Sequence, residues 1–161
     1  MSKKTLILVF YVLFGCGMTM AEEVQKSELQ QRAEAIDANK NIASARSTYI
    51  RAFEDYAAKG NIRQAAECGA KATELYYKEN YWQEAFDLLR RIDQAANADS
   101  KSSSVEKAAA HYMTSRERMK MYMKMRRGAN TLEHLKAMEN HANISGDEQL
   151  KNDLLYNKTV Y

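Results

Sequence analysis

Along most of the chain, apolar side chains recur every three or four residues, which is the spacing of one face of an α-helix. In the segment 42–59 these positions are aromatic: Tyr49, Phe53 and Tyr56. In the segment 61–78 the same spacing carries small residues: Ala65, Gly69 and Ala72. We therefore expect two neighbouring helices in which the aromatic rings lie over the small residues. Gly69 supports this packing, because glycine inside a helix costs about 1 kcal/mol relative to alanine.

Short turn signals interrupt this pattern where Gly, Asn, Asp or Ser residues stand between the apolar stripes. They lie at 59–61, 79–81, 97–104, 127–130 and 143–147. The expected helices are therefore 22–38, 42–59, 61–78, 81–96, 105–127, 132–142 and 148–161. The chain contains no proline, which agrees with uninterrupted helix interiors. This pattern predicts an all-α fold of six to seven helices, arranged as stacked antiparallel helical hairpins.

The last two expected helices differ in the placement of their apolar residues. In the segment 132–142 we expect Leu132, Leu135 and Met138 to point inward. The segment 148–161 ends on apolar residues, among them Leu155, Tyr156, Val160 and Tyr161. Helical arrays usually finish with a polar outer face. The apolar end therefore favours either a truncated piece of a longer protein or a surface that another chain covers, including self-association through this helix.

The first 21 residues have the pattern of a secretory signal peptide. Lys3 and Lys4 precede an apolar run at 5–14, and a small-residue cleavage site ends at Ala21. The run is shorter than the about 20 residues of a membrane span. Lipidation of Cys16, in a lipobox-like context, and retention of the leader as an anchor are the alternatives. We therefore expect a domain at 22–161 that lies outside the cytoplasm, in the periplasm. If the leader is lipidated or uncleaved, the domain is expected to be associated with the membrane.

Charge and cysteine content narrow the function classes. The chain has a formal net charge of +3, and the removal of two lysines with the leader lowers this to +1. Such a balance predicts no nucleic-acid partner. After cleavage Cys68 is the only cysteine, so no internal disulfide can form. Cys68 shares a helix face with Ala65 and Ala72, which is typical of a buried structural thiol.

The stretch from Tyr56 to Ala72 resembles a tetratricopeptide repeat. That family places an aromatic residue near the end of its first helix, glycine at the turn and alanine along its second helix; the matching residues are Tyr56, Gly60, Ala65 and Ala72. Gly69 stands where the family prefers an aromatic residue. A second partial match begins at Tyr76, 20 residues on, whereas the family period is about 34 residues. The resemblance implies a tetratricopeptide-like α-solenoid.

The combination of a leader, imperfect helical repeats and an apolar end is also similar to a more specific group. These are the extracytoplasmic repeat regions of bacterial membrane sensor proteins of the histidine-kinase type. This resemblance implies a part in signal transduction as a sensor or ligand-binding fragment. The sequence contains no kinase motif of its own.

Two groups of residues have side chains that could bind a metal or take part in catalysis. The segment 113–127 is rich in methionine and basic residues, but side chains two apart on a helix point in opposite directions. Its methionines are expected to fill the core and its cations to form a solvated helix face. His111, His134 and His141 lack the one-turn spacing of a zinc helix motif. We therefore expect no metal, no cofactor and no catalytic residue.

The remaining hypothesis is a non-enzymatic module that binds a protein or peptide partner on its concave side. The candidate contact residues combine an aromatic cluster with a basic pair: Tyr76, Tyr77, Tyr81, Trp82, Arg90 and Arg91. Aromatic and arginine side chains are enriched among the anchors of protein interfaces. A ligand-binding fragment of a membrane sensor is the alternative function.

Overall fold

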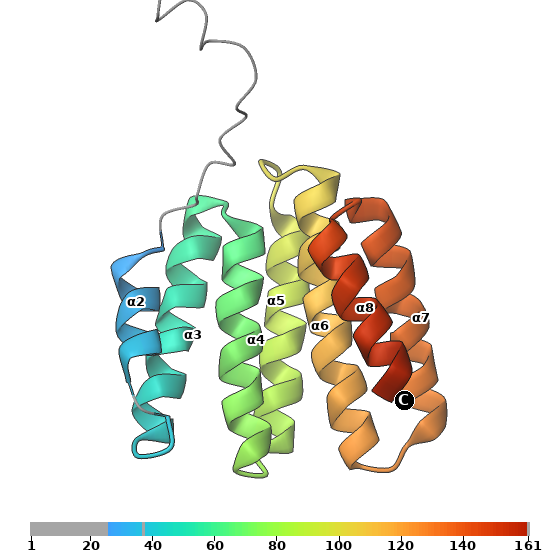
Figure 1. Ribbon diagram of the computed structural model, residues 1–161. Coiled ribbons are helices and arrows are strands. Elements are labelled where there is room, and N and C mark those ends of the chain that lie inside the picture. The colour runs from blue at the N-terminus through green and yellow to red at the C-terminus, as the bar shows by residue number, and fades with distance from the viewer. Residues whose placement is uncertain (1–25, 37, 161) are drawn as a thin grey trace, which may run out of the picture.

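The computed structural model describes residues 26–36 and 38–160, and all the regular structure within them is α-helical (Figure 1). These residues form seven helices: α2 (Glu28–Ala35), α3 (Ile42–Lys59), α4 (Ile62–Lys78), α5 (Trp82–Ala98), α6 (Ser104–Lys124), α7 (Gly128–Ser145) and α8 (Glu148–Val160). The all-α prediction and the expected number of helices are confirmed. The predicted leader at 1–21, the lipidation site Cys16 and the last residue Tyr161 lie outside the described residues.

Local capping chemistry explains most of the helix ends. Gly60 and Gly146 follow α3 and α7 in the left-handed conformation, with φ of 78° and 66°, which glycine adopts without strain. The α6 helix starts with a capping box in which Ser103 and Glu106 satisfy each other's backbone donors. The turns predicted at 59–61 and 79–81 are confirmed.

Three predicted boundaries are wrong. The helix predicted at 22–38 already ends at Ala35. The turn expected at 127–130 lies earlier, because α6 ends at Lys124 and α7 already begins at Gly128. Arg126 reverses the chain in a left-handed conformation with φ of 56°, a role for which the sequence offers a glycine only two residues later. The helix predicted at 132–142 also continues to Ser145, where Gly146 ends it.

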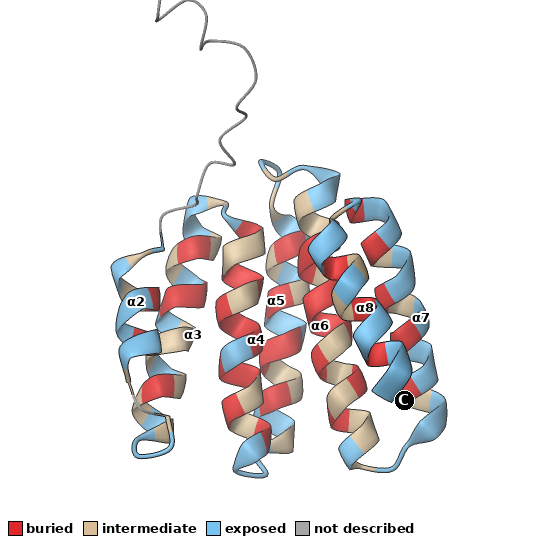
Figure 2. Cartoon of the chain, in the orientation of Figure 1, coloured by how far each residue is buried: buried red, intermediate tan, exposed pale blue. Residues whose placement is uncertain are grey.

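The helices α2 to α7 follow one another across the molecule in chain order, and α8 lies in front of α6 and α7 in this view (Figure 1). Each helix packs against the next in the sequence, and α4 also packs against α6. Buried residues line the helix faces that meet, whereas exposed residues gather on the outer faces and at the turns (Figure 2). The α4 helix is therefore covered by three neighbours, α3, α5 and α6.

The small stripe of α4 is buried as predicted, but a different side chain requires it. A Cβ atom at Gly69 would lie 2.4 Å from Cδ1 of Ile92 and 3.6 Å from Cδ2 of Phe53. Phe53 therefore makes an ordinary contact, and it is Ile92 of α5 that needs the missing methyl group. The expectation that the aromatic stripe of α3 explains Gly69 is corrected, because α5 approaches the same face more closely.

The α6 helix is buried on two opposite sides. Met119 and Met121 point in opposite directions, and 1% and 0% of their surfaces are exposed. The partners of α6 are α4, α5 and α7, so it lies between both halves of the molecule. Its methionines fill the core, as expected from their flexible side chains.

The inner face of α7 differs from the prediction at one position. Leu135 and Met138 are buried, but Leu132 is 42% exposed. The residues that face the core are Thr131, Leu135, Met138, Ala142 and Ser145, spaced by four, three, four and three. Leu132 lies about 100° around the helix from this stripe. A hydroxyl-bearing residue, Thr131, takes the inner position because its hydroxyl donates to the carbonyl of Arg127 at 2.9 Å.

The last helix, α8, has apolar side chains on its exposed surface. Leu150 and Leu154 are buried, whereas Leu155, Tyr156 and Val160 are 61%, 67% and 55% exposed. Self-association through this surface stays a prediction. Among the helices that the structure describes, none combines the length and the hydrophobicity needed to cross a membrane.

Candidate ligand groove

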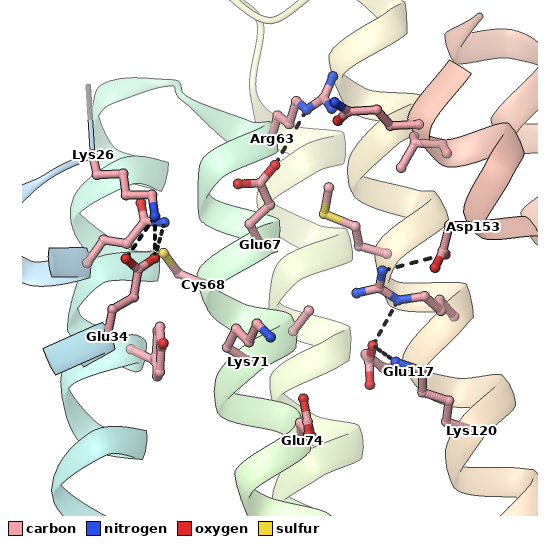
Figure 3. Close-up of a pocket in the computed structure, with 17 residues that line it drawn as sticks. Lys26, Glu34, Arg63, Glu67, Cys68, Lys71, Glu74, Glu117, Lys120 and Asp153 are labelled. Atoms are coloured by element: carbon pink, nitrogen blue, oxygen red, sulfur yellow. Dashed lines mark hydrogen bonds and ion pairs between the residues drawn. The ribbon is translucent and has the colours of Figure 1, made fainter. Parts of the chain in front are cut away.

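A pocket of about 540 Å³ lies over the more exposed face of α4. Side chains of α2 and α3 border it on one side, and those of α6 and α8 border it on the other (Figure 3). Four side chains of α4 form its base: Arg63, Glu67, Lys71 and Glu74. Their spacing of four, four and three residues places them on the helix face opposite the buried small stripe.

A second pocket, of about 220 Å³, continues the first along α4. The two pockets share four lining residues: Glu34, Tyr49, Lys71 and Glu74. The second pocket extends to Lys78, near the end of α4. Both pockets together are named the α4 groove, and the base runs from Arg63 to Lys78. At 1.5 Å per residue, this length is about 22 Å.

The side of the groove formed by α6 is organised around a buried carboxylate. Glu117 is only 2% exposed and accepts hydrogen bonds from Arg116 at 3.0 Å, Lys120 at 3.0 Å and the Tyr77 hydroxyl at 3.1 Å. These three donors satisfy a charge that would be costly to bury alone. Arg116 also lies 3.6 Å from Asp153 of α8. Burial lowers the pKa of Arg116, but the charges of Glu117 and Asp153 outweigh this and raise it overall.

The opposite side depends on an ion pair next to α2. The ammonium group of Lys26 lies 2.8 Å from Glu34, and this hydrogen bond lowers the pKa of the Glu34 carboxyl. At one end of the groove Arg63 lies 2.6 Å from Asp147, which follows α7. The ion pairs therefore connect α4 with the last helices and order the groove over its whole length.

Cys68 borders the groove in an environment that disfavours its thiolate. Its side chain is almost fully buried, and burial, with a smaller contribution from Glu67, raises the pKa of the thiol to about 12. The thiolate, which is the reactive form, is therefore only a small fraction at neutral pH. The expectation of a buried structural thiol at Cys68 agrees with this environment.

None of the six candidate contact residues predicted from the sequence lines the groove. The four aromatic residues form two pairs: Tyr77 stacks on Trp82 at 6.2 Å, and Tyr76 meets Tyr81 edge to face at 6.4 Å. The guanidinium of Arg46 lies over both rings of the second pair.

The predicted basic pair lies on α5, which contributes no residue to the groove. Arg90 pairs with Asp87, and Arg91 pairs with Glu54 at 2.7 Å. Both arginines are exposed. The structure therefore places the aromatic residues around one turn and the arginines further along α5, with their charges already compensated.

The ion pairs of Arg116 and Arg118 on α6 were not predicted from the sequence. These arginines do not form a solvated face, because Arg116 binds Glu117 and Asp153, and Arg118 binds Asp93 at 2.6 Å. One signal was available in the sequence. Glu117 is a single acid within a run of basic residues, which is an arrangement that favours burial of that acid among the cations.

A second polar cluster lies between α5, α6 and α7, away from the groove. Asp93 interacts with His111 Nδ1 at 2.9 Å, the Thr114 hydroxyl at 2.7 Å and Arg118. Burial raises the pKa of Asp93, but the hydrogen bond from His111 and the charge of Arg118 lower it overall. The second ring nitrogen of His111 lies 3.1 Å from Asn97 Oδ1, so both nitrogens are occupied.

His141 completes this cluster. Its ring lies 5.4 Å from that of His111, and its buried Nδ1 atom has no hydrogen-bond partner in the described part of the chain. Within residues 26–36 and 38–160, no group of three or more His, Cys, Asp or Glu side chains is placed to hold a metal ion. The cluster therefore presents a packed structural network.

Comparisons of this chain with protein-family models, curated proteins and solved structures found no match.

Proposed function

We propose that the chain is a non-enzymatic binding module that holds an extended peptide segment of a partner protein in the α4 groove. The observation that carries this proposal is the shape of the groove, an elongated hollow along one helix. Its base is about 22 Å long, and an extended chain advances about 3.3 Å per residue, so about seven peptide residues would span it.

The lining supports a polar, sequence-selective ligand. Five basic and five acidic side chains line the larger pocket: Lys26, Arg63, Lys71, Arg116 and Lys120, with Glu34, Glu67, Glu74, Glu117 and Asp153. Pockets for small apolar molecules are instead lined mainly by hydrophobic and aromatic groups. A peptide carries backbone donors and acceptors along its length, which such a lining can match.

The chemistry at the groove favours binding over catalysis. A nucleophile would need a neighbouring base, yet the thiol of Cys68 stays protonated and both ring nitrogens of His111 are engaged outside the groove. The proposal includes the tetratricopeptide-like α-solenoid as the architecture and an extracytoplasmic location through the leader. The contact of α4 with both α5 and α6 supports such a stack.

Selection from a library of random peptides, followed by nuclear magnetic resonance mapping, tests the proposal. We expect a selected peptide to shift the amide signals of groove residues on α4, α6 and α8. Replacement Gln149→Trp would place a bulky ring at the exposed border of the groove and weaken binding about tenfold or more, which is about 1.4 kcal/mol.

The matched control lies on the alternative surface. Replacement Arg91→Ala should leave the affinity unchanged, because Arg91 lines neither pocket. If the selected peptides shift the signals of Tyr81, Trp82 and Arg90 instead, the aromatic and basic surface is the binding site. If no peptide binds, the proposed function is wrong.

A further inference from the structure

The charged groups along the α4 groove are paired with one exception. Each lining acid accepts an ion pair: Glu34 from Lys26, Glu67 from Arg63, Glu74 from Lys78, Glu117 from Arg116 and Lys120, and Asp153 from Arg116. Among the five lining bases, Lys71 alone has neither an ion pair nor a hydrogen bond within the residues that the structure describes. Among the described residues, the groove thus holds one lysine without a direct ion pair.

The position of Lys71 is central. It is exposed, it lines both pockets, and it lies about midway between Arg63 and Lys78 at the ends of the base. Figure 3 shows Lys71 between the Glu34 side and the Glu117 side of the groove. A ligand that follows the groove would have to pass this ammonium group.

A neutral donor lies at the same junction. Tyr49 also lines both pockets, is half-buried, and its hydroxyl has no hydrogen-bond partner within the described residues. The charges of Glu34 and Glu74 act on Tyr49, and the charge of Lys71 acts on those same two carboxyls. Burial, and secondly the charge of Glu34, raises the pKa of Tyr49 and keeps its hydroxyl able to donate.

We infer that Lys71 and Tyr49 form the central anchor of the groove and bind the side-chain carboxylate of an acidic residue in the peptide. This inference rests on the proposed function. A carboxylate accepts hydrogen bonds from both groups and supplies the charge that Lys71 lacks. The nearby acids do not oppose it strongly, because Glu34 and Glu74 are neutralised by Lys26 and Lys78.

The anchor selects a side-chain carboxylate over the terminal carboxylate of the peptide because the anchor lies in the middle of the groove. The groove continues past Lys71 in both directions, toward Arg63 and toward Lys78. An extended peptide that fills this length has an internal residue at its middle. The terminal carboxylate of the same peptide would lie near one end of the groove, away from the anchor.

The affinity of a peptide obtained by the library selection, measured for defined variants, tests the anchor. Because a hydrogen bond to a charged group contributes about 1.5–3 kcal/mol, Lys71→Gln should weaken binding about tenfold or more. Lys71→Glu should weaken it further, and Tyr49→Phe should weaken it by a few-fold. Lys136→Gln, which changes an exposed lysine of α7 outside both pockets, should have no effect. Circular dichroism and thermal unfolding verify that each variant is folded.

Changes in the peptide identify the carboxylate. Replacement of one internal Asp or Glu by its amide should cause the same loss as Lys71→Gln and should add nothing in that variant. Amidation of the peptide terminus should change little. If the terminus matters and the internal acids do not, the side-chain assignment is wrong.

The two proposals fail in different ways. The anchor is wrong if a peptide binds in the groove with an affinity that does not depend on Lys71, or if the bound peptide contains no acidic residue. The groove would then still be a binding site. A selection that yields no peptide at the groove overturns both.

Discussion

At the scale of single residues, the missing side chain of Gly69 is the clearest link between sequence and packing. A helix interior disfavours glycine, so its presence signals a close approach. The structure shows that the approaching group is the end of Ile92, which is 2% exposed and has little freedom to move. The cost of a poor helix former on α4 is thereby offset by tight packing against α5.

We predict that Gly69→Ala destabilises the protein despite the better helix propensity. The new methyl group would meet Cδ1 and Cγ1 of Ile92 at 2.4 and 2.8 Å. Overpacking costs about 1–3 kcal/mol and the propensity gain is about 1 kcal/mol, so a net loss of about 1 kcal/mol is expected. Urea unfolding measures it.

The companion variant Ile92→Val identifies the cause. It removes the nearest atom, so Gly69→Ala should cost less in the Ile92→Val background than in the native chain, with a coupling of about 1 kcal/mol. Equal costs in both backgrounds would show that the clash is not with Ile92.

At the scale of helices, α2 is attached to the rest of the molecule mainly by hydrogen bonds and not by apolar packing. The α2 helix has eight residues, and an isolated helix of this length is marginal in water. Ala33 is buried and Leu29 half-buried, so α2 offers little apolar surface. Its attachment therefore depends on Tyr56 of α3, whose hydroxyl accepts from the Ser27 amide at 2.6 Å and donates to Gln30 at 2.9 Å.

We predict that Tyr56→Phe loosens α2 while the remaining helices stay intact. Loss of the two hydrogen bonds should cost about 1–2 kcal/mol, because the buried Gln30 Oε1 loses its donor. Hydrogen exchange should become faster in residues 28–35 and remain unchanged in α4 to α7. Tyr81→Phe, at an exposed ring, serves as the control and should change neither. Uniform acceleration over all helices would contradict a local role.

At the scale of the whole molecule, burial of histidine links stability to pH. The pKa values of His134 and His141 are lowered, first by burial and then by the neighbouring charges of Arg118 and His111 respectively. Asp93 acts on both in the opposite direction. In the unfolded chain both histidines recover their ordinary pKa of 6.5.

We predict that the free energy of unfolding falls as the pH drops below 6.5. In that range the two histidines bind more protons in the unfolded chain than in the folded chain. The free energy of unfolding therefore rises with pH and levels off above 6.5. The variant His141→Phe keeps a ring beside His111 and removes the unpaired Nδ1 atom, so it should reduce this pH dependence. Urea unfolding at about pH 5.5 and about pH 7.5 measures it. An unchanged pH dependence in the variant would contradict the role of His141.

Local patterns alone predicted the helices and most of their ends, because helical periodicity and capping are properties of neighbouring residues. The small stripe Ala65, Gly69 and Ala72 marked a close helix contact, and Cys68 marked a buried thiol. The errors occurred where the local preference did not decide the outcome. Arg126 took the turn in place of Gly128, and Thr131 took the inner position in place of Leu132.

The candidate site was decided by the tertiary structure. The α4 groove combines side chains from five helices and neighbouring turns, and its charges are compensated across distances such as Arg63 to Asp147. The sequence shows which residues are charged, but the cation left without a partner depends on which helix faces meet. This is set by the packing of all helices together. A short-range pattern therefore determined the elements, and long-range packing determined that Lys71 of the groove has no ion pair among the described residues.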